Sequence, residues 1–481
     1  MHFDNLDFKF KKKLENNIFL LLLILCFVSR LSSSIFYFED IDSIRFAMAA
    51  VEFDVLNSRP HFPGYPIFCF ISQLFLKITK NLGFTFSIIG SISTFLILYY
   101  SYKIWNLIFK ESSLFFIYFL FFNPFLWLMS NRYMPDLLGL SMIYAGLYYF
   151  LKIKNMNDSK KYFIYLGIII SVICGIRISY LPFLFPTIIL ISNKKFRFLI
   201  ISFFLTSLIW LTPFLYLSGI DEIISLFKND SYGHFYNWGG TIISSESSIL
   251  KRLQIMISFM FIDGFSFWSP FRHWSTIINS VFLILFTLFS IKSFKYFFNK
   301  KNYLIIICAL IYAVWVLLFQ NVQYKPRHLM PFIPLICIFF AKGVLKLKSK
   351  IKFNNLIILI FLIFHTFITI NIINQHTNQS AISQIYSFLN DKKDDKIIVL
   401  SDDLKIFYWT KHSNLSNIKY FNSKNLHKKL DEIKIHEKTK IYSTNKIQIQ
   451  GFAISEIINF YHNPHVNRLW STLTLYEYEK N

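Results

Sequence analysis

Long, uninterrupted apolar runs restrict this sequence more than any other feature does. Many of them exceed the roughly 18–20 residues that a helix needs to cross the hydrocarbon core of a bilayer, and their apolar residues are continuous rather than alternating. Continuous runs exclude a membrane β-barrel, whose strands alternate between lipid-facing and lumen-facing residues. With 54% hydrophobic and 20% aromatic residues, the sequence predicts an all-α, multi-pass membrane protein.

The basic residues are concentrated in the short connections between these runs. The formal net charge of +23 suits a nucleic-acid partner, but Lys and Arg in short loops orient a membrane protein and meet anionic headgroups. We therefore expect membrane lipids as partners and no nucleic acid. A lysine-rich stretch, residues 9–13, predicts a cytoplasmic N-terminus. The apolar run after it lacks a small-residue cleavage site, so we expect it to remain as a span and not to be removed as a signal peptide.

The distribution of charge also decides how the spans are counted. Full spans are expected at residues 17–36, 83–102, 113–130, 137–151, 162–178, 180–192, 198–217, 274–291, 303–320, 327–345 and 353–372. This makes about 11 spans, and segments 64–80 and 254–270 are expected to enter the membrane without crossing it. Counting both short segments as spans would reverse the loops between them and lose the charge bias. The connections expected inside contain Lys103 and Lys110; Lys152, Lys154, Lys160 and Lys161; Lys194, Lys195 and Arg197; Lys292, Lys295, Lys300 and Lys301; and Lys346, Lys348, Lys350 and Lys352.

The five cysteines all lie inside apolar segments and are read as small core residues. They indicate neither a disulfide framework nor a cysteine metal site. They are Cys26, Cys69, Cys174, Cys308 and Cys337.

Two longer regions are expected outside the membrane. Residues 218–273 form an external loop with an aromatic end, which suits either an interfacial belt or a lip that binds the acceptor. From residue 380 a helix at 381–390 and short strand patterns at 396–401, 418–421, 440–443 and 473–478 predict a small external α/β domain, residues 380–481. It lacks a Gly-rich phosphate loop, so we do not expect it to bind a nucleotide. The membrane domain is accordingly residues 1–372, with a first external loop at 37–66.

This first external loop is the most unusual polar stretch of the chain. Glu39, Asp40 and Asp42 follow directly on the first apolar run, and a short helical pattern comes next. Residues 59–66 then contain three prolines and a glycine, which is too many for the interior of a helix or strand. The result is a set of carboxylates held at a membrane surface beside a stiff loop.

The stretch from Phe38 to Phe68 resembles the first external loop of the GT-C class of polytopic glycosyltransferases, which includes the protein O-mannosyltransferases and the lipid A aminoarabinose transferases. In that class an acidic residue after the first span lies in the active site, followed by a juxtamembrane helix and a Pro-rich turn. Here Asp42 stands where the family has its Asp, followed by Arg45 and the Phe46–Ala47 pair. The resemblance implies a GT-C fold and a donor sugar carried on a polyprenyl phosphate.

The resemblance makes Asp42 our first candidate for the base that deprotonates the acceptor, with Asp40 as the second. The alternative for Asp42 is an N-cap, because Asp is favoured there and the helix dipole suits its charge. Glu39 is read as an interfacial charge.

Asp136 stands at the outer start of a span, where the family has a second acidic residue. The alternative is an ordinary helix cap, since an ionisable group at a span end that faces water is tolerated. Arg132, four residues earlier, is either its ion-pair partner or a ligand of the donor phosphate.

His61 and Tyr65 belong to the Pro-rich loop and are candidate substrate-binding residues. The aminoarabinose transferases have a metal-binding Glu near His61, so a divalent cation held by Asp42, Asp136 and His61 is possible. One histidine is no metal site by itself, and the alternative is a loop histidine bonded to backbone. No metal or other cofactor is assigned.

Arg327 lies in a run, residues 325–331, that resembles a basic-Pro-Arg element common in GT-C proteins. A guanidinium there can bind a phosphate through two parallel hydrogen bonds, with Lys325 as a second cation. Arg177 falls near the same outer face and is a further phosphate ligand. The alternative for such residues is a snorkelling interface anchor.

Together these features predict an inverting, integral membrane glycosyltransferase, and we expect it in the cell membrane, by class the bacterial inner membrane. It would transfer a sugar from a polyprenyl-phosphate donor to a lipid, glycan or protein acceptor on the external face. A transporter or flippase of lipid-linked glycans is the main alternative, and a non-catalytic scaffold is a second. Transporters favour paired repeats and ionisable residues near mid-bilayer, and neither is evident in the sequence.

Overall fold

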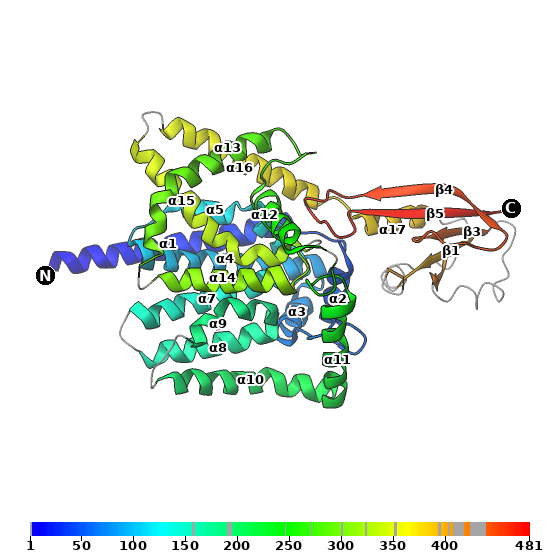
Figure 1. Cartoon of the computed structure of the whole chain (residues 1–481), viewed down its shortest axis with the longest axis horizontal. Helices are drawn as coiled ribbons and strands as arrows, with labels where there is room; N and C mark the ends of the chain where they lie inside the picture. The colour runs from blue at the N-terminus through cyan, green and yellow to red at the C-terminus, as the bar shows by residue number, and fades with distance from the viewer. Residues whose placement is uncertain are drawn as a thin grey trace. The chain divides into compact units, whose positions relative to one another are not determined.

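The computed structural model describes residues 2–155, 159–189, 195–245, 247–270, 272–299, 302–322, 325–350, 354–392, 396–402, 405–406, 418–423 and 439–481. The chain divides into two compact units (Figure 1). The first consists of Met1–Ile35 and Met48–Asn374, and the second of Phe36–Ala47 and Gln375–Asn481. Lys194, Lys300, Lys301 and Lys352, expected in the basic connections, lie outside the described residues.

The first unit consists mainly of helices joined by loops. Its helices are α1 (His2–Ser32), α3 (Pro66–Thr79), α4 (Leu82–Phe109), α5 (Leu114–Phe121), α6 (Pro124–Asn131), α7 (Asp136–Asn155), α8 (Lys160–Arg177), α9 (Leu181–Ile189), α10 (Phe196–Ser218), α11 (Ile220–Tyr232), α12 (Ile249–Phe265), α13 (Ser275–Ser290), α14 (Tyr303–Phe319), α15 (Ile333–Lys350) and α16 (Asn354–His376). Short η turns η1 (Ile178–Tyr180), η2 (Gly233–Asn237), η3 (Ile291–Tyr296) and η4 (Pro326–Phe332) connect several of them. Helix α2 (Ile41–Val51) begins in the second unit and ends in the first.

The helices confirm a multi-pass membrane protein, but the expected count near 11 is not confirmed. Among the described residues, seven helical stretches are long and apolar enough to cross a membrane, or eight if the bent pair α5 and α6 is one span. The run expected as one crossing at 113–130 bends by 50° between these two helices. Asn123 caps a new helix there and Pro124 occupies its first turn, a combination that starts helices and interrupts longer ones. The apolar part of α1, α3 and α14 are shorter.

The expected spans at 162–178 and 180–192 fall in one of the seven stretches, Lys160–Ile189, within which α8 and α9 run in opposite directions. A Cβ built on Gly139 of α7 would lie 2.8 Å from Arg177 Cβ and 3.1 Å from Tyr180 Cδ2. Two turns further along α7, one built on Gly146 would lie 3.5 Å from Ile169 and 2.6 Å from Leu184. Helix α8 is therefore antiparallel to α7, and α9 is parallel to α7. The reversal occurs at Arg177, whose backbone is extended (φ −158°, ψ 77°).

Small residues let the helix backbones approach closely, as is usual in membrane bundles. A Cβ on Gly90 of α4 would lie 1.7 Å from the carbonyl oxygen of Ser130 in α6. Gly167 faces the carbonyl of Leu199 in the same way, and Gly343 faces that of Phe286, at 2.3 and 1.9 Å. These contacts fix the pairs α4–α6, α8–α10 and α13–α15.

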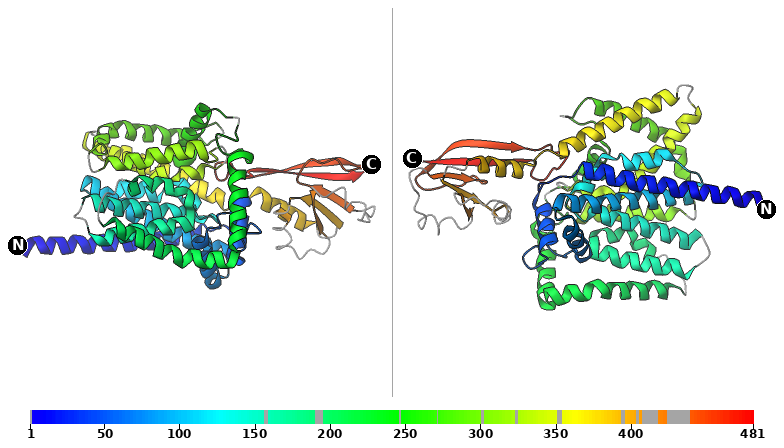
Figure 2. Two further views of the ribbon diagram at one scale, coloured as in Figure 1. Left: turned by 60° about the horizontal axis from the view of Figure 1, so that its bottom comes forward. Right: turned by 180° about the vertical axis from the view of Figure 1, so that it is seen from behind.

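Lysines contact aromatic rings at one end of the first unit, and a helix lies across the other. At the end where α1 begins, the Lys342 ammonium lies 3.8 Å from the Phe109 ring centre and pairs with Glu111, and Lys160 lies over Phe198. At the opposite end, α11 runs across the ends of the other helices (Figure 2). The expected external loop 218–273 contains two helices, α11 and α12.

The second unit contains a five-stranded sheet in the order β2-β1-β3-β5-β4. Its strands are β1 (Lys396–Ser401), β2 (Ile418–Asn422), β3 (Thr439–Ser443), β4 (Phe452–Tyr461) and β5 (Thr472–Lys480). β1 is parallel to β2 and β3, while β5 is antiparallel to β3 and β4. Helix α17 (Ala381–Asp391) precedes the sheet, whose core consists of Ile398, Leu400, Ile441, Ile449 and Tyr478.

The structure confirms the small α/β domain that the sequence predicts, including four of its strands. The prediction missed β4, because its alternating pattern is interrupted where the register shifts between Ile454 and Glu456. A bulge puts two residues of one strand opposite one of the other, and this breaks the period of two that identifies a strand.

Candidate functional site

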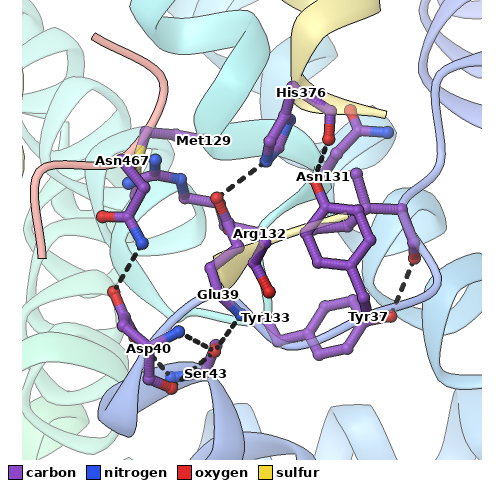
Figure 3. Close-up of polar contacts among 12 residues, drawn as sticks. Tyr37, Glu39, Asp40, Ser43, Met129, Asn131, Arg132, Tyr133, His376 and Asn467 are labelled. Atoms are coloured by element: carbon purple, nitrogen blue, oxygen red, sulfur yellow. Dashed lines mark hydrogen bonds and ion pairs between the residues drawn. The ribbon is translucent and has the colours of Figure 1, made fainter. Parts of the chain in front are cut away.

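The acidic segment, residues 37–43, belongs to the second unit and leads into α2 (Figure 3). Asp40 caps this helix: its Oδ1 accepts hydrogen bonds from the backbone amides of Asp42 (3.0 Å) and Ser43 (2.9 Å). In return the Ser43 hydroxyl accepts from the Asp40 amide at 2.9 Å. This is the reciprocal arrangement of a capping box. The N-cap is therefore Asp40, and Asp42 lies in the first turn of the helix.

Residues from the C-terminal part of the chain contact the same segment. The Nε2 atom of His376 lies 3.0 Å from Glu39 Oε1, and both side chains are 1% exposed. The Asn467 amide donates to the second oxygen of Asp40 at 3.2 Å, as Figure 3 shows. Glu39 is thus a buried hydrogen-bonded group rather than the interfacial charge expected from the sequence, because no local pattern predicts its contact with His376.

A second group of ionisable residues, which we call the arginine cluster, lies in the first unit and consists of Asp136, Arg177 and Arg327. Asp136 Oδ1 is 2.9 Å from a terminal nitrogen of Arg177 and 3.6 Å from Nε of Arg327. The three side chains are 1%, 5% and 8% exposed. The carboxylate therefore holds two guanidinium groups side by side.

Local structure explains how residues so distant in sequence meet. Asp136 is in the first turn of α7, Arg177 ends α8, and Arg327 is in the η4 turn. Gly139 leaves room for the Arg177 side chain to cross α7. The Tyr180 hydroxyl donates to the carbonyl of Arg327 at 3.2 Å, which fixes η4 against the turn after α8.

Positive charge exceeds negative charge around this cluster. Two guanidinium groups face one carboxylate, and Lys325 is two residues from Arg327. His234 of the external loop bonds to the Phe319 carbonyl at 2.8 Å. Burial lowers the pKa of His234, the bond to Phe319 acts in the opposite direction, and the charge of Lys325 lowers it further. Guanidinium groups gathered in this way can bind an anionic ligand.

Three predicted residues lie elsewhere in the first unit. Arg132 is not the ion-pair partner of Asp136; its guanidinium lies 3.7 Å from Met129 Sδ. The reason is that Arg132 ends α6 in an extended conformation (φ −74°, ψ 147°), so it shares no helix with Asp136. His61 Nε2 lies 3.2 Å from the Tyr65 hydroxyl, and the Tyr65 ring is 5.9 Å from the Arg177 guanidinium.

A divalent cation has no cluster of ligands to hold it in the part of the chain that the structure describes. No three His, Cys, Asp or Glu residues there gather in a group that could bind a metal. His61 instead contacts the hydroxyl of Tyr65. This contact favours the alternative interpretation, a structural histidine of the loop.

Sequence reasoning missed His376, Asn467 and Gly139 as contributors to these two sites. His376 closes an apolar helix, where a lone histidine has no signal of its own, and Asn467 lies in a loop between strands, one of which was not predicted. Gly139 cannot be distinguished in the sequence from the other small residues of the apolar runs. Only their tertiary contacts distinguish them.

No protein-family model and no curated protein matches this sequence. Solved structures do match. The chain is similar to ArnT from Cupriavidus metallidurans bound to undecaprenyl phosphate, with 10% identity, a TM-score of 0.55, and coverage of 95% of this chain and 97% of that chain. It is similar to the same protein in the apo state, with 10% identity, a TM-score of 0.56, and coverage of 96% and 98%. The likeness shows the fold: the chain has the GT-C architecture over nearly its whole length.

Proposed function

We propose that this multi-pass protein is a membrane glycosyltransferase that takes a sugar from a polyprenyl-phosphate donor and places it on an acceptor at the external face. The observation that carries the proposal is the buried arginine cluster at one end of a GT-C bundle, where Asp136 holds Arg177 and Arg327 together. The similarity to ArnT, solved with undecaprenyl phosphate, supports a lipid phosphate as the anion.

The arginine cluster supplies the charge that a departing phosphate needs. As the sugar leaves, negative charge grows on the phosphate oxygens, and fixed cations stabilise this charge most where water is excluded. Arg177 and Arg327 bind the phosphate and Lys325 adds a third cation. Asp136, which touches both guanidinium groups, positions them rather than accepting a proton. Loss of one such donor typically lowers the rate by about 10²–10³-fold.

Asp42 is the base of the proposed reaction. Asp40 has both carboxylate oxygens engaged, one with two backbone amides and one with Asn467, so capping α2 is its role. We assign the base to Asp42, in the first turn of the helix, because it stands where the GT-C resemblance has its catalytic acidic residue. It takes the proton of the acceptor hydroxyl or amine, and attack from the face opposite the phosphate inverts the anomeric carbon.

Both sets of residues are assigned to the same side of the membrane. The acidic segment follows Ile35, whose carbonyl accepts a hydrogen bond from the Tyr133 hydroxyl at 2.8 Å, and Tyr133 is three residues before Asp136. The lysine-rich opposite end is the cytoplasmic one by the positive-inside rule, which makes the N-terminus cytoplasmic and the C-terminal domain external.

The proposal is tested by transfer assays on membranes containing the protein and a radiolabelled polyprenyl-phosphate sugar. The expected result is transfer that Asp42→Asn abolishes at unchanged protein level, while the matched control Glu52→Gln retains it. Glu52 is an exposed carboxylate directly after α2, in a surface pair with Arg59, and such pairs contribute little. Full transfer by Asp42→Asn would contradict the base assignment. Movement of the labelled lipid across vesicles without transfer would instead support the flippase alternative.

A further inference from the structure

Every residue from Tyr37 to Asp40 contacts the C-terminal domain. We propose that this domain orients the proposed base, Asp42, and that its residues His376 and Asn467 are positioning residues. The inference rests on the function proposed above. It assigns a role to a domain for which neither the sequence nor the fold gives one.

The contacts come from three different places in the domain. At the end of α16, the carbonyl of His376 accepts a hydrogen bond from the Tyr37 hydroxyl and its ring meets Glu39. The hydroxyl of Ser380, which caps α17, donates to the carbonyl of Phe38. The loop between β4 and β5 supplies Asn467. Because these attachments are independent in sequence, the segment is held residue by residue rather than at one point.

Asn467 connects the domain to the start of α2. Its amide nitrogen donates to Asp40 Oδ2, and its own Oδ1 accepts from the backbone of Leu469 at 3.3 Å, which orients the amide. Asp40 uses its other oxygen to hold the amides of Asp42 and Ser43. A substitution of Asn467 should therefore alter the position of the Asp42 backbone, because the Asp40 carboxylate contacts both residues.

Replacing either Glu39 or His376 alone should be costly. Both groups are buried, and removing one partner of a buried pair leaves the other without compensation for its lost hydration. The neutral pair Glu39→Gln with His376→Gln keeps a donor and an acceptor in place, so it separates the need for charge from the need for a hydrogen bond.

The expected kinetic signature separates positioning from binding. The donor phosphate is assigned to the arginine cluster, which belongs to the first unit, so loss of Asn467 should leave the KM for the donor within about twofold. The kcat should fall by about tenfold to a hundredfold, because misplacing a reacting group by about 1 Å has effects of that size. A residue that only stabilises the fold would lower the amount of active protein without this split.

The experiment uses the full-length protein in lipid nanodiscs, with Asn467→Asp, Asn467→Ala and the control Asn459→Ala. Asn459 is an exposed asparagine of β4 that bonds to Thr474. Asn467→Asp places a carboxylate against that of Asp40. We expect both Asn467 variants to lose kcat at nearly constant donor KM, and hydrogen exchange to rise at the amides of Asp42 and Ser43 but not in α7. The control should match the wild type in both measurements.

The outcomes distinguish this inference from the function it rests on. If the wild type shows no sugar transfer, the proposed function fails. If the wild type transfers sugar and the Asn467 variants keep its kcat, the positioning inference is overturned and the function stands. Should the Asn467 variants prove unstable, Ser380→Ala and the Glu39→Gln, His376→Gln pair test the other two attachments, and wild-type kcat in both would equally overturn it.

Discussion

Asp136 and Arg177 form an ion pair of 2.9 Å between the first turn of α7 and the last turn of α8, and both side chains are almost fully buried. The second guanidinium, that of Arg327, approaches the same carboxylate oxygen at 3.6 Å. One carboxylate thus draws two guanidinium groups together at a single point in the fold. This concentration of guanidinium groups is the physical basis for assigning the donor phosphate to the cluster.

Asp136→Asn should destabilise the protein strongly. The substitution leaves two buried guanidinium groups without their carboxylate, and breaking buried pairs in this way typically costs about 3–5 kcal/mol. Thermal unfolding of the purified protein in detergent measures the effect. The exposed Asp221 at the start of α11 provides the control, since Asp221→Asn should change the stability by less than about 0.5 kcal/mol. An Asp136→Asn variant as stable as this control would show that the Asp136 carboxylate does not contribute to the stability of the protein.

Gly139→Ala should reduce sugar transfer by about tenfold to a hundredfold. The added methyl group would lie 2.8 Å from Arg177 Cβ, so the arginine must move away from its place beside Asp136. Steady-state transfer rates, with the amount of folded protein measured in parallel, give the effect. Gly264→Ala is the matched control, because the nearest atom to its added carbon would be 3.9 Å away. Equal rates in the two variants would contradict a role for the Arg177 position.

The two ends of the first unit should label from opposite sides of the membrane. Leu56, in the loop after α2, is 48% exposed, and Ser112, in the connection after α4, is exposed beside Glu111. In a cysteine-free background, a membrane-impermeant thiol reagent applied to intact cells should modify Leu56→Cys and not Ser112→Cys. Permeabilised cells should show labelling of both. The reverse pattern in intact cells would place the proposed site on the cytoplasmic side.

Acidification should loosen the part of the external loop that contains His234. Its pKa is lowered in the folded protein by burial and by Lys325, so the unfolded state binds the proton more readily. The stability that the neutral ring contributes is therefore present above its unfolded pKa, about 6.5, and is lost as the pH falls below it. Between pH 8 and pH 5, the unfolding temperature of the wild type should fall more than that of His234→Gln. Parallel curves for the two proteins would show that this histidine does not contribute.

The sequence by itself determined the class of fold and most of the candidate residues of the site. Apolar runs of membrane length have no stable soluble alternative, because each would expose its side chains to water, and alternating segments after residue 380 predicted the small sheet. Residues such as Asp136, Arg177 and Arg327 were recognisable because charged groups at the ends of spans are few.

Only the tertiary structure decided which of these residues meet. Asp136 pairs with Arg177 and Arg327 rather than with Arg132, since the close packing of α7 against α8 outweighs nearness in the chain. Likewise His376 and Asn467 reach the acidic segment from the far end of the sequence. Periodicity and composition report what surrounds each residue on its own helix or strand, whereas a contact between distant segments depends on how the whole chain packs, and no local pattern encodes it.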